Sequence, residues 1–339
     1  MNRHERLRQL MKRRGVDAVV LRRPANFSWY TGGADAKVDH VALEGVADLV
    51  VRGDSQLVLT NTIEAPRMRA EQVPALEVLE YPWYKDRLAA LRDIVGDACV
   101  GSDSALPGTT DLSEEIAALR RILDTDAIES LRAVGAAASA AMAEAAEAVE
   151  DGMTEHQAAA ALGAACRRRG LTATVLLAAA DERIAMHRHP VPVGATIERR
   201  AMLVASAERG GLYANLTQIV ELDDPDPELI RRQYACDEIL ARMRDEATRP
   251  GRTLSDAFAD CRRFYAEAGF PGEWCFHHQG GLTGYASREL IATPATDAVI
   301  EAGQAFAWNP SIAGAKAEET FVLTDSGPEL VASVALAVA

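Results

Sequence analysis

The chain has 339 residues, 48% of them hydrophobic and 25% charged, which is the composition of a soluble globular protein with about two domains. Its formal net charge of −14 argues against a nucleic-acid-binding protein, because such proteins present a basic face. The five cysteines are scattered without a CxxC pair, which excludes a zinc ribbon and is typical of reduced thiols.

The N-terminal residues lead into a charged amphipathic pattern and lack the apolar stretch of a signal peptide. No run approaches the roughly 18 apolar residues of a membrane-spanning helix. We therefore expect a cytoplasmic protein that does not act at a membrane.

The first third of the chain alternates helix and strand patterns. Residues 3–14 predict a helix because apolar residues recur every three or four positions, and Gly15 suits its C-cap. We expect a buried strand over 16–21, an aromatic-rich turn or short helix over 26–33, and strands over 47–51 and 57–59. This order predicts a small α/β domain over residues 1–124.

A second domain is expected over residues 125–339. Its first helix begins at caps near Asp124, and a second begins at Thr154. Strand-like runs then lie at 172–178, 201–206, 211–221, 303–308 and 318–324, with helices near 227–247 and 254–268. Strands and helices in separate blocks favour an α+β domain.

Polar residues that could carry chemistry gather in four stretches, at 186–190, 210–218, 277–282 and 308–320. Taken singly, each has an ordinary structural explanation, since Asn-Pro and Gly-Gly pairs usually form turns. The two histidine pairs in these stretches could contribute to a metal site, but adjacent pairs converge on one ion only with further ligands.

The order of these stretches resembles the creatinase/aminopeptidase P/prolidase family over nearly the whole chain. The Asn-x-x-Trp-Tyr-Thr-Gly stretch that begins at Asn26 resembles part of that family's N-terminal domain. The resemblance implies an α+β protein with a small α/β N-terminal domain followed by a pita-bread domain.

The resemblance also identifies the positions at which metallopeptidases of this family bind two metal ions. Those positions hold Val204, Asn215, His278, Asn309 and Glu318, so only the histidine and the glutamate are retained. Residues 203–218 contain no Asp, so a shifted alignment brings in none, and Glu208, the only carboxylate there, lies in the turn before Gly210. We expect no bound metal and no cofactor, because neutral side chains cannot offset the charge of two divalent cations.

Creatinase shows that the family can hydrolyse a C–N bond without metal. The resemblance therefore implies a metal-independent hydrolase that acts on a small polar amide, amidine, guanidine or cyclic amino-acid derivative. His187 matches the acid/base position, and His189, two residues away, is the alternative for that role. His278 and Glu318 complete the expected catalytic set, with His277 and Glu319 as the alternatives for the inward-facing positions.

The expected partners are a small-molecule substrate and a second copy of the chain. Six residues are predicted to bind the substrate: His189, Asn215, Tyr285, Trp308, Asn309 and Lys316. The resemblance implies a homodimer, in which Phe27, Trp29 and Tyr30 either contact the partner or form the core of the N-terminal domain.

Three other functions remain open on the sequence. The chain could be a non-catalytic pita-bread protein that binds a ligand or peptide in the old cleft. It could be an Xaa-Pro peptidase with a weak metal site, although the missing carboxylates argue against this. A lyase or other rearrangement chemistry could use the same pocket.

Overall fold

The structure, a computed structural model, describes residues 2–334. The chain forms two compact units that divide between Arg121 and Ile122, close to the division expected after residue 124. Within the described residues, no helix is long and apolar enough to cross a membrane.

Unit 1 is built on one six-stranded sheet with the strand order β4-β3-β2-β1-β5-β6. Its strands are β1 (Ala18–Leu21), β2 (Ala47–Arg52), β3 (Ser55–Asn61), β4 (Glu77–Tyr81), β5 (Val100–Ser102) and β6 (Thr110–Asp111). Its helices are α1 (Arg3–Arg14), α2 (Pro24–Thr31), α3 (Ala65–Arg67), the π-turn η1 (Met68–Gln72), α4 (Arg87–Val95) and α5 (Ser113–Arg120). Strand β1 pairs antiparallel to β2 and parallel to β5.

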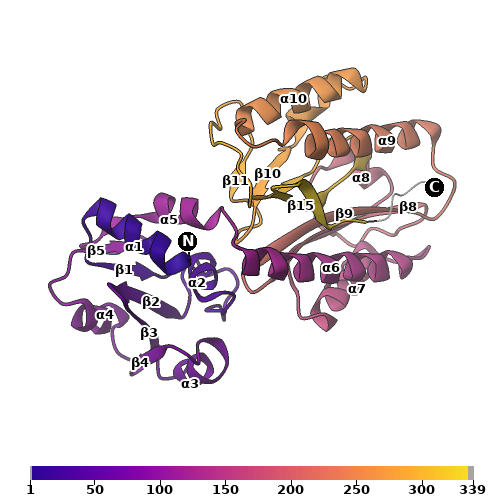
Figure 1. Cartoon of the computed structure of the whole chain (residues 1–339). Coiled ribbons are helices and arrows are strands. Elements are labelled where there is room, and N and C mark those ends of the chain that lie inside the picture. Colours follow the sequence, from indigo (N-terminus) through magenta and orange to yellow (C-terminus); the bar gives the residue numbers. More distant parts are fainter. Residues whose placement is uncertain (1, 335–339) are drawn as a thin grey trace. The chain divides into compact units, whose positions relative to one another are not determined.

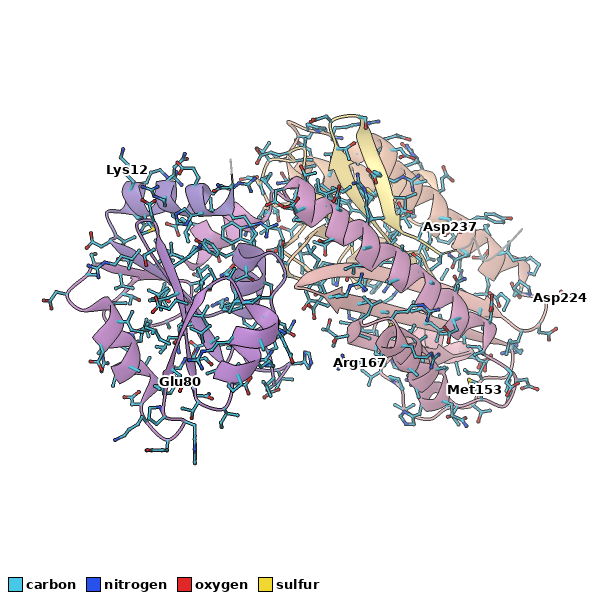
Figure 2. All side chains as sticks on the ribbon, turned by 60° about the horizontal axis from the view of Figure 1, so that its bottom comes forward. Lys12, Glu80, Met153, Arg167, Asp224 and Asp237 are labelled. Atoms are coloured by element: carbon cyan, nitrogen blue, oxygen red, sulfur yellow. The ribbon has the colours of Figure 1, made fainter. Side chains whose placement is uncertain are left out.

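The ends of α1 follow local hydrogen bonding. Asn2 accepts a hydrogen bond from the backbone N–H of Glu5, and Gly15 ends the helix in the left-handed conformation that suits glycine. Lys12, which lies in the last turn, is exposed and projects away from the unit (Figure 2).

The aromatic residues of α2 lie inside unit 1. Phe27, Trp29 and Tyr30 expose only 0%, 2% and 8% of their surface. They therefore lie in the core of the N-terminal domain, which is one of the two roles open to them. The homodimer itself stays a prediction.

Unit 2 contains three sheets and the longer helices. Its helices are α6 (Thr125–Glu147), α7 (Glu155–Arg168), α8 (Glu182–Met186), α9 (Pro227–Arg242), the π-turn η2 (Met243–Ala247), α10 (Leu254–Glu267) and the 3-10 turn η3 (Glu273–Phe276). Its strands are β7 (Thr172–Ala180), β8 (Arg200–Arg209), β9 (Leu212–Glu221), β10 (Gly280–Thr283), β11 (Leu290–Ile291), β12 (Ala305–Trp308), β13 (Ser311–Ile312), β14 (Ala315–Lys316), β15 (Glu319–Thr324) and β16 (Gly327–Ala332).

The two larger sheets of unit 2 are both antiparallel. One has the order β7-β8-β9 and the other the order β11-β10-β12-β15-β16, and β13 pairs with β14 separately. A single bridge between Thr217 and Glu318 links β9 to the chain just before β15. Helices α6 and α7 lie along one side of these strands, and α9 and α10 lie along the other (Figure 1).

The helix starts expected near Asp124 and Thr154 are present. The Asp124 side chain caps α6 by accepting from the backbone N–H of Ala127. Thr154 and Gln157 form a reciprocal capping box at the start of α7. These caps orient the pair of helices that supports the β7-β8-β9 sheet.

Candidate active site

A cavity of about 220 Å³ lies in unit 2 beside the β7-β8-β9 sheet. Part of its lining is apolar and comes from β7 and β8: Val175, Leu177 and Val204. The polar part consists of His189, Ser206, His278, Ser287, Arg288, Asn309, Lys316 and Glu318. These polar residues come mainly from segments that connect helices and strands, which is where fixed scaffolds usually present functional groups.

Two glycines place the histidine segment at the cavity. Gly280 and Gly281 have φ values of 93° and 146°, and they run between β12 and β11. A Cβ atom at Gly280 would lie 2.1 Å from the carbonyl oxygen of Ala307. Only glycine therefore allows β10 to pair so closely on both sides, and this pairing holds His277 and His278 just before the strand.

The charged part of the cavity centres on Glu318, which is almost fully buried. Its carboxylate accepts a hydrogen bond of 2.6 Å from Arg288 and one of 2.8 Å from the hydroxyl of Thr217. The Lys316 ammonium nitrogen lies 3.3 Å from Oε2 of Glu318. Burial alone would raise the pKa of Glu318, but Lys316 and Arg288 outweigh burial and lower it to about 2.

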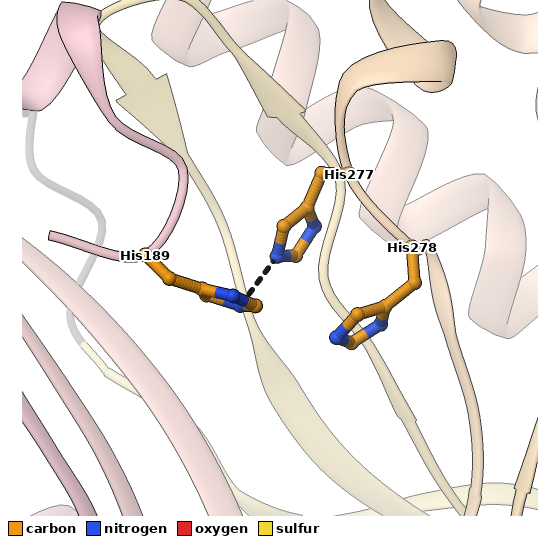
Figure 3. Close-up of side chains that lie close together, drawn as sticks. All are labelled: His189, His277 and His278. Atoms are coloured by element: carbon orange, nitrogen blue, oxygen red, sulfur yellow. Dashed lines mark hydrogen bonds between the residues drawn. The ribbon is translucent and has the colours of Figure 1, made fainter.

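Three histidines lie close together, as Figure 3 shows, and two of them, His189 and His278, line the cavity with Glu318. The Nε2 atoms of His189 and His277 lie 2.9 Å apart, so one ring donates a hydrogen bond to the other. The rings of His277 and His278 stack with centroids 4.5 Å apart. Nδ1 of His278 accepts a hydrogen bond from the backbone N–H of Gly280, which leaves the proton of the neutral ring on Nε2.

All three histidines are held in the neutral form. Burial, followed by the nearby Lys316, lowers the pKa of His277 to about 2. Burial and Arg288 lower the pKa of His278 to about 4. Burial and Lys316 also lower the pKa of His189. At neutral pH these rings therefore serve as hydrogen-bond donors and proton acceptors and add no charge to the cavity.

The structure separates the two candidate acid/base histidines. His187 and His189 are both exposed, but only His189 lines the cavity, and the predicted first choice, His187, does not. The expectation that both point to one face assumed an extended segment. The chain instead bends at residues 188 and 189, directly after α8, and this bend turns only His189 toward His277.

Three of the predicted substrate-binding residues line the cavity and three do not. His189, Asn309 and Lys316 line it. Asn215 lies beneath it, fully buried and hydrogen-bonded to Ser206 and Thr283. Tyr285 is buried elsewhere, and Trp308 is a core residue whose indole N–H donates to Thr248. These three positions were expected from order along the chain, which does not determine the direction of a side chain.

The predicted catalytic set left two further pairs of alternatives, Glu318 or Glu319 and His278 or His277, and the structure shows which of them line the cavity. Glu318 lines the cavity, while Glu319 pairs with Arg244 at 2.7 Å. His278 lines the cavity directly, and His277 contacts it through its bond to His189. Sequence reasoning missed Arg288, which lies 30 positions before its partner Glu318 and within no motif that would mark it.

These residues do not fit the two-metal centre of the metallopeptidases that the sequence resembles. Val204 offers no ligand atom, and Asn215 is already engaged by two side chains. Lys316 and Arg288 occupy both oxygens of Glu318, so protein cations take the contacts that a metal would need.

The histidine cluster is a weak alternative for a single ion, although its ligand atoms lie within 4.8 Å of one another. Imidazole lone pairs lie in the ring plane, and the nearly parallel rings of His277 and His278 do not aim at one point. In addition, the free nitrogen of His278 carries the proton.

Comparisons with known proteins agree with this fold. Residues 3–134 match the creatinase/prolidase N-terminal domain, and residues 129–325 match metallopeptidase family M24. No curated protein matches the chain. Among solved structures, X-Pro aminopeptidase from Thermotoga maritima MSB8 is 20% identical with a TM-score of 0.82, over 100% of this chain and 99% of that one.

Two further structures show how widely the fold is shared. Prolidase from Pyrococcus horikoshii OT3 is 18% identical with a TM-score of 0.82, over 98% of both chains. The N-terminal domain of the FACT complex subunit SPT16 from chickpea is 12% identical with a TM-score of 0.72, over 97% of this chain and 93% of that one.

All of these structures are at most 20% identical to the chain, and they show that it shares their fold. The α+β fold with a pita-bread second domain is confirmed, and so is the expectation of a hydrolase at the level of the family. The match to residues 129–325 covers more than half of the sequence, and the chain therefore belongs to metallopeptidase family M24.

Proposed function

We propose that the chain is an amide hydrolase of the X-Pro peptidase type whose pocket works without the family's two metal ions. The family membership and the prolidase relatives support hydrolysis of an amide bond in a small peptide-like substrate. The observation that carries the metal-free part is the buried Lys316 ammonium, 3.3 Å from Glu318.

Without a metal to acidify water, the hydrolase needs a side chain that accepts a proton near neutral pH. His189 suits this role because it is neutral and lines the cavity, and its Nε2 is paired with His277. His189 takes a proton from water as the water oxygen bonds to the amide carbon. It then returns that proton to the leaving nitrogen as the C–N bond breaks.

Two neutral groups are suited to stabilise the developing oxyanion. Nε2–H of His278 is available as a donor because Nδ1 is occupied by Gly280. Asn309 also lines the cavity, and the Nδ2–H groups of its side-chain amide are the donors that it offers. Glu318 offsets part of the positive charge that forms on His189 during the reaction, against the opposing charges of Lys316 and Arg288.

Turnover of Xaa-Pro dipeptides after dialysis against a chelator tests the proposal. We expect hydrolysis to survive chelation, and elemental analysis to find less than one tightly bound divalent metal per chain. Activity that appears only with added Mn²⁺ or Co²⁺, together with two bound equivalents, would establish the metal-dependent peptidase instead.

A pair of histidine variants tests the assignment of the base. His189→Gln should lower kcat by about 10²–10⁴-fold, the usual contribution of a general acid/base. His187→Gln, two residues away and outside the cavity, should retain turnover. The reverse result would restore His187 as the base. Ligand binding with no turnover in the unaltered chain would favour the non-catalytic binding protein.

A further inference from the structure

The acid/base histidine of the proposed function stands on a segment without regular structure. His189 lies at a bend after α8, among residues that form neither helix nor strand, and it is exposed. Its partner His277 comes from a different segment, directly after η3 (Figure 3). One hydrogen bond between the two rings gains too little free energy to hold two such segments in place, so other contacts must do so.

The residues on either side of His189 are both anchored. Pro190 is buried. Arg188 forms an ion pair with Glu273 and donates a hydrogen bond of 3.4 Å to the hydroxyl of Ser311. The Arg188 side chain is only 18% exposed and that of Glu273 only 24%, so water and salt screen this pair less than they screen surface pairs. The segment is therefore fixed on both sides of the residue that reaches His277.

Glu273 also connects the other segments of the candidate site. It begins η3, four residues before His277. Besides its pair with Arg188, its Oε2 accepts a hydrogen bond of 3.0 Å from the backbone N–H of Ala313. Ala313 lies between β13 and β14, three residues before Lys316, which lines the cavity. One carboxylate thus joins three segments that carry residues of the candidate site.

We propose that Arg188 and Glu273 are positioning residues, whose ion pair holds His189 against His277 in the geometry that proton transfer needs. Neither residue lines the cavity, so both act through the histidines and not through contact with a substrate. The inference rests on the proposed function, because it explains how the acid/base of that function is held. A displacement of about 1 Å in a catalytic group can lower turnover by about 10²-fold.

The kinetics of Xaa-Pro dipeptide hydrolysis test the proposal. Arg188→Gln and Glu273→Gln should each lower kcat by about 10²-fold. The KM should change by less than about threefold, because neither side chain lines the cavity. The two substitutions together should lower kcat no further than either alone, since both break the same pair. Arg188→Lys keeps the positive charge and should recover part of the lost turnover.

Nitrogen NMR of the imidazole rings in isotope-labelled protein tests the same geometry without a substrate. The Nε2 shifts of His189 and His277 report the hydrogen bond between these atoms, and His189→Gln and His277→Gln assign the two signals. Both shifts should move in Arg188→Gln and in Glu273→Gln. They should return toward the values of the unaltered chain in Arg188→Lys.

Arg199→Gln is the matched control, because Arg199 is 59% exposed, pairs with Glu182 and lies outside the cavity. This variant should change neither kcat nor the Nε2 shifts. Circular dichroism establishes that each variant is folded. If Arg188→Gln does not fold, Glu273→Gln carries the test, because its amide oxygen still offers an acceptor to Ala313.

Three results would overturn the inference: unmoved Nε2 shifts in the folded variants of the pair, an equal loss of kcat in the Arg199 variant, or loss of the fold in both Arg188→Gln and Glu273→Gln. The proposed function fails separately. If the unaltered chain hydrolyses no dipeptide but its shifts respond as expected, the hydrolase is refuted and the positioning pair stands. Turnover that persists in both pair variants with unmoved shifts would do the opposite.

Discussion

Each unit buries one carboxylate between two cations, and the two arrangements differ in a way that separates structure from function. In unit 1, Asp48 is fully buried and bonded to Arg22 at 3.0 Å and to Arg87 at 2.6 Å. In unit 2, Glu318 is held by Arg288 and Lys316.

The unit 1 cluster is electrically complete. Glu44 binds both terminal guanidinium nitrogens of Arg22, so two carboxylates balance two guanidinium groups. Arg87 also donates to the carbonyl oxygen of Gly45. Within residues 2–334, the unit 2 cluster has no second carboxylate, and it faces a cavity. A balanced, satisfied cluster fixes a fold, whereas a surplus charge beside a cavity is suited to a ligand.

The largest effect expected from this comparison is on the stability of unit 1. Asp48→Asn leaves Arg87 without a carboxylate partner and Arg22 with only Glu44. Breaking a buried ion pair from one side typically costs about 3–5 kcal/mol. The midpoint of urea unfolding, followed by circular dichroism, measures this loss. Arg69→Gln, which breaks an exposed pair with Glu80, is the control; equal midpoints for both variants would contradict the comparison.

The sequence predicted those features that depend on neighbours along the chain. The start of α6 at Asp124 and the box at Thr154 followed from local capping rules, and the strands of unit 2 from short apolar runs. The helix expected over 227–247 ends differently, because its last turn widens into η2. There Thr248 donates to the carbonyl of Met243 and receives the indole N–H of Trp308, a partner 60 positions away.

The candidate site was less predictable because long-range packing forms it. The resemblance selected Glu318 and His278 as site residues, and both line the cavity. The resemblance could not show the bend at residues 188 and 189, because of which His189 lines the cavity and His187 does not. Nor could it show that Arg288 reaches Glu318, since no local pattern records a contact across 30 residues.

The next effect is a pH dependence of stability that the histidines confer on unit 2. His277 and His278 have folded-state pKa values of about 2 and about 4, below the ordinary 6.5, because they are buried near Lys316 and Arg288. As the pH falls below 6.5, these histidines bind protons in the unfolded chain but stay neutral in the native state. Each ring therefore lowers the stability as the pH falls, by up to about 1.4 kcal/mol per pH unit. Glu319 and Asp237 act in the opposite direction, because burial raises their pKa values to about 7 and about 6.

Urea unfolding at pH 7, 6 and 5 measures that slope. The window lies above the ordinary pKa of 4.5 for Glu318, whose own contribution is lost only as the pH falls from there toward about 2. His278→Gln should flatten the slope, whereas His40→Gln, in unit 1, should not change it. An unchanged slope in the His278 variant would show that this ring is already charged in the native state.

The smallest effect concerns the stability contributed by Lys316, and it separates the two clusters most directly. If Lys316 served the fold as Arg87 does, Lys316→Met would cost about 3 kcal/mol or more, as expected for a broken buried pair. Glu318 would, however, still be bound by Arg288 at 2.6 Å and by Thr217 at 2.8 Å in this variant. The substitution also removes an unneeded positive charge and places an apolar side chain of similar length in a buried position. Replacing a buried charge by a well-packed apolar group is often neutral or stabilising. We therefore expect a change of less than about 1 kcal/mol in the free energy of unfolding at pH 7, measured by urea titration. A loss of unfolding free energy as large as that of Asp48→Asn would show that Lys316 stabilises the fold. The positive charge of Lys316 would then be explained without a ligand.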